Sequence, residues 1–262
     1  MRKSLILLII LAFVGLSGAS FISLTPGIEN ENVVTGNEST LNFTLSNSGD
    51  EPAYDVVASL FLPEGMRAED LFAGRLDDNS SYSGRFRISL DDALLPGAYS
   101  IPLIVDYKDA NGHPFSAVYS FSQVVRQAAF SKVTPRFNDL EISDRGGGEL
   151  KLSLRNLDEK NHQAKVSFFL PRELRSDADE KIIPVSEKSD SEVVFSVSSF
   201  DALAGSRYAV FAVVSYEEDG VHYSTYSSGI VKVVAEKPLP SWIPLAALAG
   251  LVIVFIVYQL KK

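Results

Sequence analysis

Apolar and polar residues alternate through the stretch 99–125, which is interrupted once by the turn residues 109–112. One face of each half carries apolar side chains, most of them large: Tyr99, Ile101, Leu103, Val105, Tyr107, Phe115, Ala117, Tyr119 and Phe121. A period of two residues on both sides of a short turn containing Asn-Gly is typical of a β-hairpin with one buried face. The pattern therefore predicts a pair of antiparallel strands at this point of the chain.

A second hairpin of the same kind follows about 108 residues further along, within 196–234. The Asp-Ala-Leu motif at 92–94 recurs at 201–203, and the Asn-Gly turn at 111–112 recurs as Asp-Gly at 219–220. An offset of this length is close to the size of one β-sandwich domain and exceeds that of a solenoid repeat. The chain is therefore predicted to use one β-module twice.

Further alternating segments precede each hairpin, with turn residues between them. They lie at 39–46, 53–62 and 85–90 in the first copy and at 149–157, 164–170, 181–185 and 192–198 in the second. With the hairpins they suggest about seven strands per copy, the number expected of an immunoglobulin-like β-sandwich. We expect an all-β protein of two tandem immunoglobulin-like sandwiches, over 21–127 and 128–235, with a short and stiff connection between them.

The N-terminus carries a different pattern. Arg2 and Lys3 precede an apolar run over 5–16, and small residues follow at 17–20. A basic region, a short apolar core and a small-residue site are typical of a secretory signal peptide, which we place at 1–20. We expect cleavage after Ala19 or Ser20, and an uncleaved anchor is the alternative. In both cases the chain that follows is exported.

The C-terminus resembles a membrane anchor. The stretch 242–260 has no charged residue and is long enough to cross the apolar core of a bilayer. Trp242 and Tyr258 occupy the positions of interfacial aromatic residues, and Lys261 and Lys262 supply the positive charge expected on the inner side. We therefore predict a transmembrane helix at 242–260.

This anchor defines the predicted topology. Residues 236–241 form a brief stalk and 261–262 a cytoplasmic tail, so the protein is expected to be a single-pass type I protein of the cell membrane with most of its chain extracytoplasmic. The second module would then lie near the membrane and the first would be distal. The alternative is a sorting signal that is cut and replaced by a lipid, but Leu-Pro-Ser at 239–241 matches known cleavage motifs poorly.

Composition narrows the chemistry. The 262 residues include no cysteine, which excludes disulfides and thiolate-ligated metals. The formal net charge of -9, without a basic stripe, argues against nucleic acid as a partner. No Gly-x-Ser-x-Gly elbow, phosphate-binding loop or His-Glu-x-x-His motif occurs. We therefore expect a protein that is not an enzyme and needs no cofactor.

Two groups of side chains are weak candidates for metal binding. In the first module, Asp50, Asp77, Asp78 and Asp109 fall in turns that meet at one end of a sandwich and could supply oxygen ligands to Ca²⁺, although no Asp-x-Asp-x-Asp loop is present.

In the second module, His162 and His222 lie in loops at one end of the predicted sandwich, and His113 follows the turn of the first hairpin. Carboxylates that could join them as metal ligands are Asp158, Glu159, Glu217, Glu218 and Asp219. No close His-x-His or His-x-x-x-His spacing occurs, so solvated acidic loop tips are the favoured interpretation.

Asn-x-Ser/Thr sequons occur at Asn37, Asn42 and Asn79, all in the first module. They are candidate glycosylation sites if the host carries out N-glycosylation. Tyr99 and Tyr208 each stand just after a turn at the start of a strand. This position matches the tyrosine corner, in which the hydroxyl bonds back to the preceding turn.

Several short motifs carry a resemblance to a known group of proteins. They are Asn-x-Gly-Asp-Glu-Pro-Ala at 47–53, Leu-Pro-Glu-Gly at 62–65, Leu-Pro-Gly-x-Tyr at 95–99 and the Asn-Gly turn. They resemble the immunoglobulin-like modules of archaeal S-layer-domain-like proteins and the related cell-adhesion-related (CARDB) and NPCBM-associated modules. The second module matches less closely, with Leu-Pro-Arg at 170–172 and Leu-Ala-Gly at 203–205.

The resemblance implies an archaeal, surface-exposed, non-enzymatic module, often in tandem and tethered to a membrane. We expect a structural or interaction protein of the cell envelope that contributes to surface assembly or adhesion, with other envelope or membrane proteins as partners. The alternative is a non-catalytic accessory or binding subunit of a membrane complex, such as a transporter or a secretion or glycosylation machine. Homo-oligomers through paired edge strands remain open.

Overall fold

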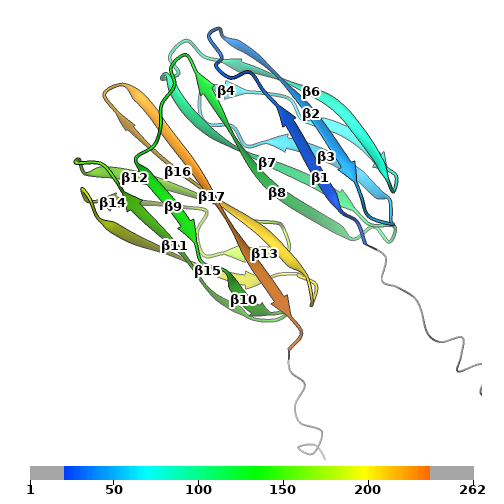
Figure 1. The fold of residues 1–262 in the computed structure, drawn as a ribbon. Helices are drawn as coiled ribbons and strands as arrows, with labels where there is room; N and C mark the ends of the chain where they lie inside the picture. Colours follow the sequence, from blue (N-terminus) through cyan, green and yellow to red (C-terminus); the bar gives the residue numbers. More distant parts are fainter. Residues whose placement is uncertain (1–20, 237–262) are drawn as a thin grey trace, which may run out of the picture.

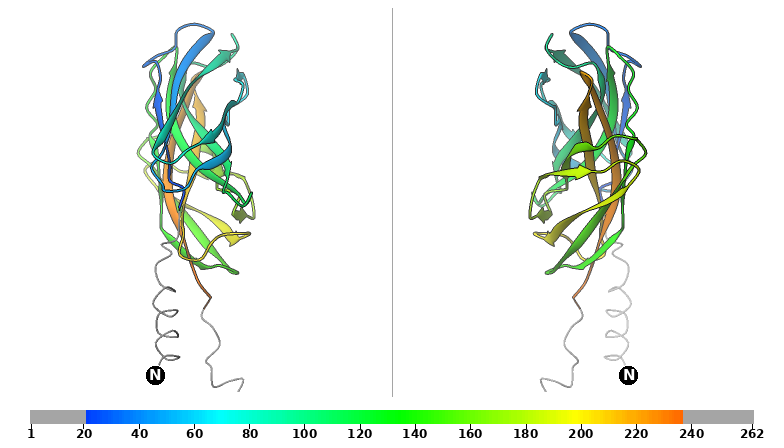
Figure 2. Two further views of the ribbon diagram at one scale, coloured as in Figure 1. Left: turned by 90° about the vertical axis from the view of Figure 1, so that its right-hand side faces the viewer. Right: turned by 90° about the vertical axis from the view of Figure 1, so that its left-hand side faces the viewer.

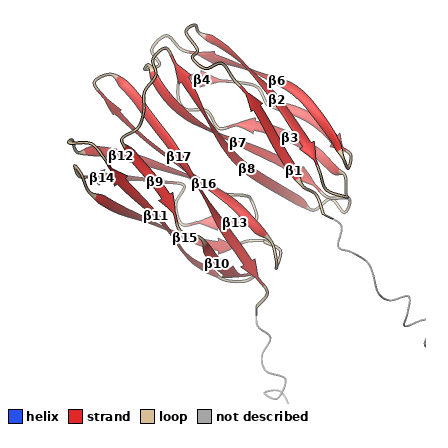
Figure 3. Cartoon of the chain, viewed as in Figure 1, coloured by secondary structure: helices blue, strands red, loops and turns tan. Residues whose placement is uncertain are grey.

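The computed structural model describes residues 21–236. The predicted signal peptide at 1–20 and transmembrane helix at 242–260 lie outside these residues, as do Trp242, Tyr258, Lys261 and Lys262. Within 21–236 every regular element is a strand (Figure 3), so the expected all-β fold is confirmed. The same range contains no helix of the length and apolar character needed to cross a bilayer.

The first module contains eight strands arranged in two facing sheets. One sheet has the order β1-β2-β6-β4, and the other has the order β5-β3-β7-β8. The strands are β1 (Leu24–Glu29), β2 (Glu38–Asn47), β3 (Ala53–Leu60), β4 (Met66–Arg67), β5 (Leu71–Leu76), β6 (Ser80–Leu90), β7 (Gly97–Lys108) and β8 (Pro114–Val125).

The second module contains nine strands and repeats this topology. One sheet has the order β9-β11-β15-β13, and the other has β14-β12-β16-β17 with β10 added parallel to β17. The strands are β9 (Val133–Phe137), β10 (Leu140–Ser143), β11 (Gly147–Asn156), β12 (His162–Phe169), β13 (Leu174–Ser176), β14 (Glu180–Val185), β15 (Asp190–Ser199), β16 (Arg207–Glu218) and β17 (Val221–Val234).

The two modules share an unusual detour between their sheets. After β3 the chain crosses to the opposite sheet for the two-residue strand β4, beside β6, and then returns as β5 to pair with β3. In the second module, β13 pairs with β15 and β14 returns to β12 in the same way. Val34 pairs in parallel with Val125 at the position where β10 pairs with β17. The repeat read from sequence therefore extends to details of topology.

Each module has its own apolar core. The buried residues form one cluster within 24–125 and another within 133–233. Phe43, Phe86 and Leu103 are among the fully buried side chains of the first cluster, and Leu152 and Phe195 are among those of the second. The alternation recognised in the sequence is the alternation between core and outer face, because successive residues of a strand point to opposite sides.

The modules lie side by side, with β7 and β8 of the first next to β16 and β17 of the second (Figure 1). At the contact, β7 and β17 form one parallel pair, Gly97 with His222, which joins the sheet of β7 to the sheet of β17. Strand β1 begins and strand β17 ends at the same end of the molecule (Figure 2). This arrangement differs from the expectation of an outer module stacked on an inner one.

Docking of the modules buries the second face of β7, whereas the sequence pattern predicted a hairpin with one buried face. Residues 97–103 are all buried, although their side chains alternate between the core and the other module. Ser100 donates its backbone N–H to Ser224 Oγ at 3.1 Å, and the rings of Tyr99 and His222 stack at 4.2 Å. Phe61 meets Phe169 edge to face at 4.9 Å.

The connection between the modules is fixed at both ends, in agreement with the stiff joint predicted. Arg126 donates from its guanidinium to the backbone oxygens of Asp91, Asp92 and Leu94, at 2.5–3.2 Å. At the other end, Lys132 donates its backbone N–H to the hydroxyl of Tyr216 at 3.0 Å.

Candidate functional site

The four calcium candidates of the first module do not form a ligand group. Within the described residues, the side chains that lie close enough together to share a metal ion belong to the second module. Instead, Asp109 Oδ1 accepts the backbone N–H of His113 at 2.8 Å, Asp77 pairs with Arg75 at 2.7 Å, and Asp50 Oδ1 accepts from Phe21 N at 2.7 Å. Asp78 is exposed in the turn between β5 and β6. These carboxylates therefore shape turns.

The sequons are spread over the length of the first module. Asn37 precedes β2, Asn42 lies within β2, and Asn79 stands in the turn before β6. Because β2 and β6 are antiparallel, with Glu38 opposite Ser89 and the end of β2 opposite the start of β6, Asn37 and Asn79 lie at opposite ends. Asn37 and Asn42 are exposed, as is Asn79. All three are accessible to solvent in the described fold.

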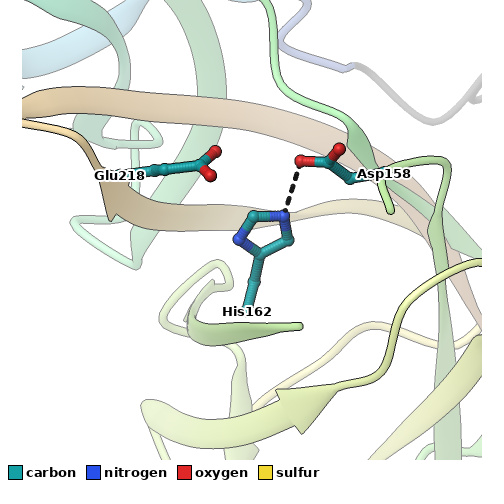
Figure 4. A group of neighbouring side chains, drawn as sticks. All are labelled: Asp158, His162 and Glu218. Carbon is teal, nitrogen blue, oxygen red and sulfur yellow. Dashed lines mark hydrogen bonds and ion pairs between the residues drawn. The ribbon is translucent and has the colours of Figure 1, made fainter. Parts of the chain in front are cut away.

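The one metal-like group of the described residues is Asp158, His162 and Glu218 (Figure 4). Their ligand atoms lie within 4.8 Å of one another. The turn between β11 and β12 supplies Asp158, the start of β12 supplies His162, and the end of β16 supplies Glu218. His162 Nε2 is 3.0 Å from Asp158 Oδ2, and its buried ring packs against Tyr216.

A lysine already pairs with one member of this group. The ammonium of Lys160 forms an ion pair with Glu218 and lies 3.4 Å from Asp219 Oδ2. The pKa of Asp158 is held below its usual range, mainly by the hydrogen bond from the backbone N–H of Glu159 and to a lesser degree by the hydrogen bond with His162. The arrangement is best described as an ion-pair cluster that ties two turns together, because a metal ion would have to displace a cation that is already in contact.

The other two histidines occupy the contact between the modules and are not the solvated loop tips expected from sequence. His222 donates its backbone N–H to Pro96 O at 2.9 Å and stacks on Tyr99. Burial lowers the pKa of its imidazole, which Glu217 partly offsets. His113 lies 3.5 Å from Asp201 Oδ2 of the second module. Sequence reasoning placed both residues just after hairpin turns but did not reveal what covers them.

A cleft opens between the modules beside β8. Its volume is about 560 Å³, and residues 115–119 of the first module and 206–209 of the second line it. Glu173, at the turn before β13, borders this cleft and is only 2% exposed. Its Oε1 accepts the backbone N–H of Ser116 at 3.3 Å, and Ser116 Oγ accepts the backbone N–H of Arg172 at 2.8 Å. These bonds join the modules directly.

Glu173 is electrostatically unusual. Burial raises the pKa of its carboxyl to about 7, although backbone donors, Arg172 and His113 act in the opposite direction. Its Oε2 is buried and has no hydrogen-bond partner among residues 21–236. A buried, unpaired carboxylate oxygen is costly, so the position requires an explanation beyond the packing of one module.

Sequence reasoning missed Glu173, but a signal was present. The motif Leu-Pro-Glu-Gly at 62–65 departs to Leu-Pro-Arg-Glu at 170–173, so Glu173 replaces Gly65. The same hydrogen bond closes the turn in both modules, from Met66 N to Pro63 O and from Leu174 N to Pro171 O, although only Gly65 has a positive φ, of 87°. The difference between the two copies is visible in the sequence, whereas only the docked modules show what surrounds Glu173.

Comparisons with known proteins assign no family to this chain. No protein-family model and no curated protein matches the chain. A crystal structure of Salmonella alpha-2-macroglobulin is 11% identical with a TM-score of 0.36, covering 82% of this chain and 16% of that one. The native E. coli alpha-2-macroglobulin is 11% identical with a TM-score of 0.32, covering 80% of this chain and 17% of that one.

The chain thus spans less than a fifth of these two macroglobulins. A protein of unknown function from Porphyromonas gingivalis is 12% identical with a TM-score of 0.31, covering 80% of this chain and 99% of that one. At this level of similarity none of these structures carries a functional argument.

Proposed function

We propose that the protein is a membrane-anchored, extracytoplasmic structural and interaction protein of the cell envelope, built from two immunoglobulin-like sandwiches that act as one rigid body. The sheet orders β1-β2-β6-β4 and β5-β3-β7-β8 support the immunoglobulin-like assignment, because they place strands of the A-B-E-D and C′-C-F-G type on opposite sides of one core. The predicted export signal and anchor support the location.

The observation that carries the proposal is the docking of the modules. Direct hydrogen bonds, stacked rings and a tethered connection hold them side by side. A rigid pair presents one continuous outer surface, which suits an assembly or adhesion element better than a flexible string of modules does. With an anchor after β17, both modules would stand next to each other on the membrane.

The test is crosslinking in intact cells, followed by detergent extraction, pull-down and mass spectrometry. We expect recovery of the protein itself or of abundant envelope proteins. Recovery of a stoichiometric integral-membrane partner would instead support an accessory subunit of a membrane complex, and the absence of any envelope protein among the products would contradict the proposal.

One observation favours that second candidate function. An aromatic row runs across both modules from Phe61 through Phe169 and its cross-strand neighbour Phe211 to Tyr226. Phe61 is 58% exposed and Tyr226 is 38% exposed. Exposed aromatic residues that line up in this way are enriched at contacts between proteins, so a lateral partner could bind there.

A further inference from the structure

The cleft beside β8 combines aromatic walls with a buried carboxyl group. Tyr107, Phe115 and Tyr119 line it from the first module, and Tyr208 and Glu173 line it from the second. The rings of Tyr107 and Phe115 are stacked at 5.6 Å. A volume of about 560 Å³ lies within the range of small-molecule sites, which often form between domains.

The charges around the cleft leave it acidic. Glu51, Asp109 and Glu173 border it, and Arg207 is the one cation in the described part of its lining. Asp109 Oδ1 accepts the backbone N–H of His113 within the hairpin turn, and Glu51 Oε1 accepts the backbone N–H of Ala110 at 3.2 Å.

The other basic side chains close to Glu173 each lie beside another carboxylate. Arg172 lies 3.7 Å from Asp106, and His113 lies 3.5 Å from Asp201. The carboxyl of Glu173 therefore lacks a dedicated counter-ion among the described residues, and its Oε2 lacks a hydrogen-bond donor there.

The fold of the module does not require this carboxyl. Gly65 occupies the equivalent turn of the first module, where its backbone oxygen accepts from Asp91 N at 2.8 Å. Glu173 makes the same backbone bond, accepting from Phe200 N at 2.9 Å. The side chain is therefore an addition at the place where the modules meet.

We propose that the cleft binds an alkylammonium group, with the Glu173 carboxylate as its counter-ion and the tyrosine and phenylalanine rings packing against its methylene groups. Aromatic rings beside an anion are the surroundings that organic cations prefer. The same chemistry is carried by a lysine side chain of a protein partner and by a free amine. The site is independent of whether the protein serves in envelope assembly or in a membrane complex.

The first experiment is calorimetric titration of the full-length protein in detergent with n-butylammonium chloride and with acetyl-Gly-Lys-Gly-amide. Both probes are expected to bind if a partner supplies the cation, and the free amine alone if the ligand is a small molecule. n-Butanol and the norleucine peptide are neutral controls of similar shape. Equal binding of the neutral controls would show an apolar cleft only and would overturn the proposal.

The variant Glu173→Gln keeps an oxygen for Ser116 N and removes the charge, so it should weaken the binding of both cationic probes at least tenfold. Glu187→Gln, which changes an exposed carboxylate in a loop of the same module, should bind as the natural protein does. Unchanged affinity in Glu173→Gln would overturn the proposal.

A second measurement on the natural protein avoids any effect of substitution on folding. Because burial raises the pKa of Glu173 to about 7, the site is largely protonated at pH 5, and the affinity for n-butylammonium should fall at least tenfold between pH 8 and pH 5. His113 and Arg172 face the same carboxyl, and Glu173→Gln, which keeps both of them, should lose most of this pH dependence. Affinity independent of pH in the natural protein would contradict the assignment.

Discussion

Two asparagines, Asn47 and Asn156, hold the same turn in each module. Both are 1% exposed. Asn47 Oδ1 accepts from Gly49 N at 3.0 Å, as Asn156 Oδ1 accepts from Asp158 N at 2.8 Å. Each amide also donates across the end of the sandwich, to Leu76 O in the first module and to Ser186 O in the second. One buried side chain thus satisfies backbone groups of two separate turns.

Asn156→Ala should lower the free energy of unfolding by about 2–3 kcal/mol, because buried donors and acceptors lose their partner. Chemical denaturation followed by fluorescence measures the change. Asn138→Ala, at an exposed position, is the matched control and should change it by less than about 0.5 kcal/mol. Equal effects of the two substitutions would contradict this role of Asn156.

Glu173 makes stability depend on pH. Its pKa is about 7 in the folded protein against 4.5 ordinarily, so between these values the native state binds more protons than the unfolded state. The free energy of unfolding should therefore rise as the pH falls from 8 to 5, by on the order of 1.4 kcal/mol for each unit of pKa difference. Thermal unfolding at several pH values tests this, and Glu173→Gln should flatten the slope in this window.

At the scale of elements, β7 is the strand on which docking depends. A Cβ atom at Gly97 would lie 1.9 Å from the backbone oxygen of His222, and the backbone φ of Gly97 is 148°. Glycine is required at this point because the start of β17 passes directly over the backbone of β7. The hydroxyl of Tyr99 donates to Leu95 O at 2.7 Å, and that of Tyr208 accepts from Leu203 N at 2.9 Å, so the tyrosine-corner interpretation is confirmed in both modules.

Gly97→Ala should separate the modules locally without unfolding either core. We expect faster hydrogen exchange at Ser100 and Ser116, whose amides bond across the contact, and a loss of roughly 2–4 kcal/mol in stability. Gly205→Ala is the control, since its φ is 91° but nothing lies within 4 Å of the added Cβ. If both variants accelerate exchange at these two serines alike, backbone strain rather than the contact with His222 is the cause.

At the scale of the whole molecule, the side-by-side modules bring the start of β1 and the end of β17 to one end (Figure 2). The chain could therefore leave its sandwich pair toward a membrane without crossing its surface. The sequons at Asn37, Asn42 and Asn79 then run along one flank of the pair and not over a distal cap.

Deletion of residues 242–260 should release the protein from membranes into the extracytoplasmic fraction, because residues 21–236 contain no helix long and apolar enough to cross a bilayer. Fractionation with immunoblotting measures this. Replacement of the segment by an unrelated transmembrane helix should restore membrane association. Persistent membrane association of the deleted protein would contradict anchoring by this segment.

The sequence by itself determined the class of fold and the repeat. Alternation with a period of two fixes which residues face a core, and the Asn-Gly and Asp-Gly turns fix where each hairpin reverses, since both are local properties of the backbone. The very short strands β4 and β13 escaped this reasoning. They have too few residues to show a period, and their place depends on the strands beside them.

The tertiary structure alone decided how the modules meet. The face of β7 that carries Ser100 and Pro102 contacts residues more than a hundred positions away in the chain, so the local pattern does not identify what covers it. For the same reason His113, His222 and Glu173 became residues of a shared contact only when the second module was placed against the first. Local patterns specify strands, whereas the surroundings of a charge are set by chain segments that are distant in sequence.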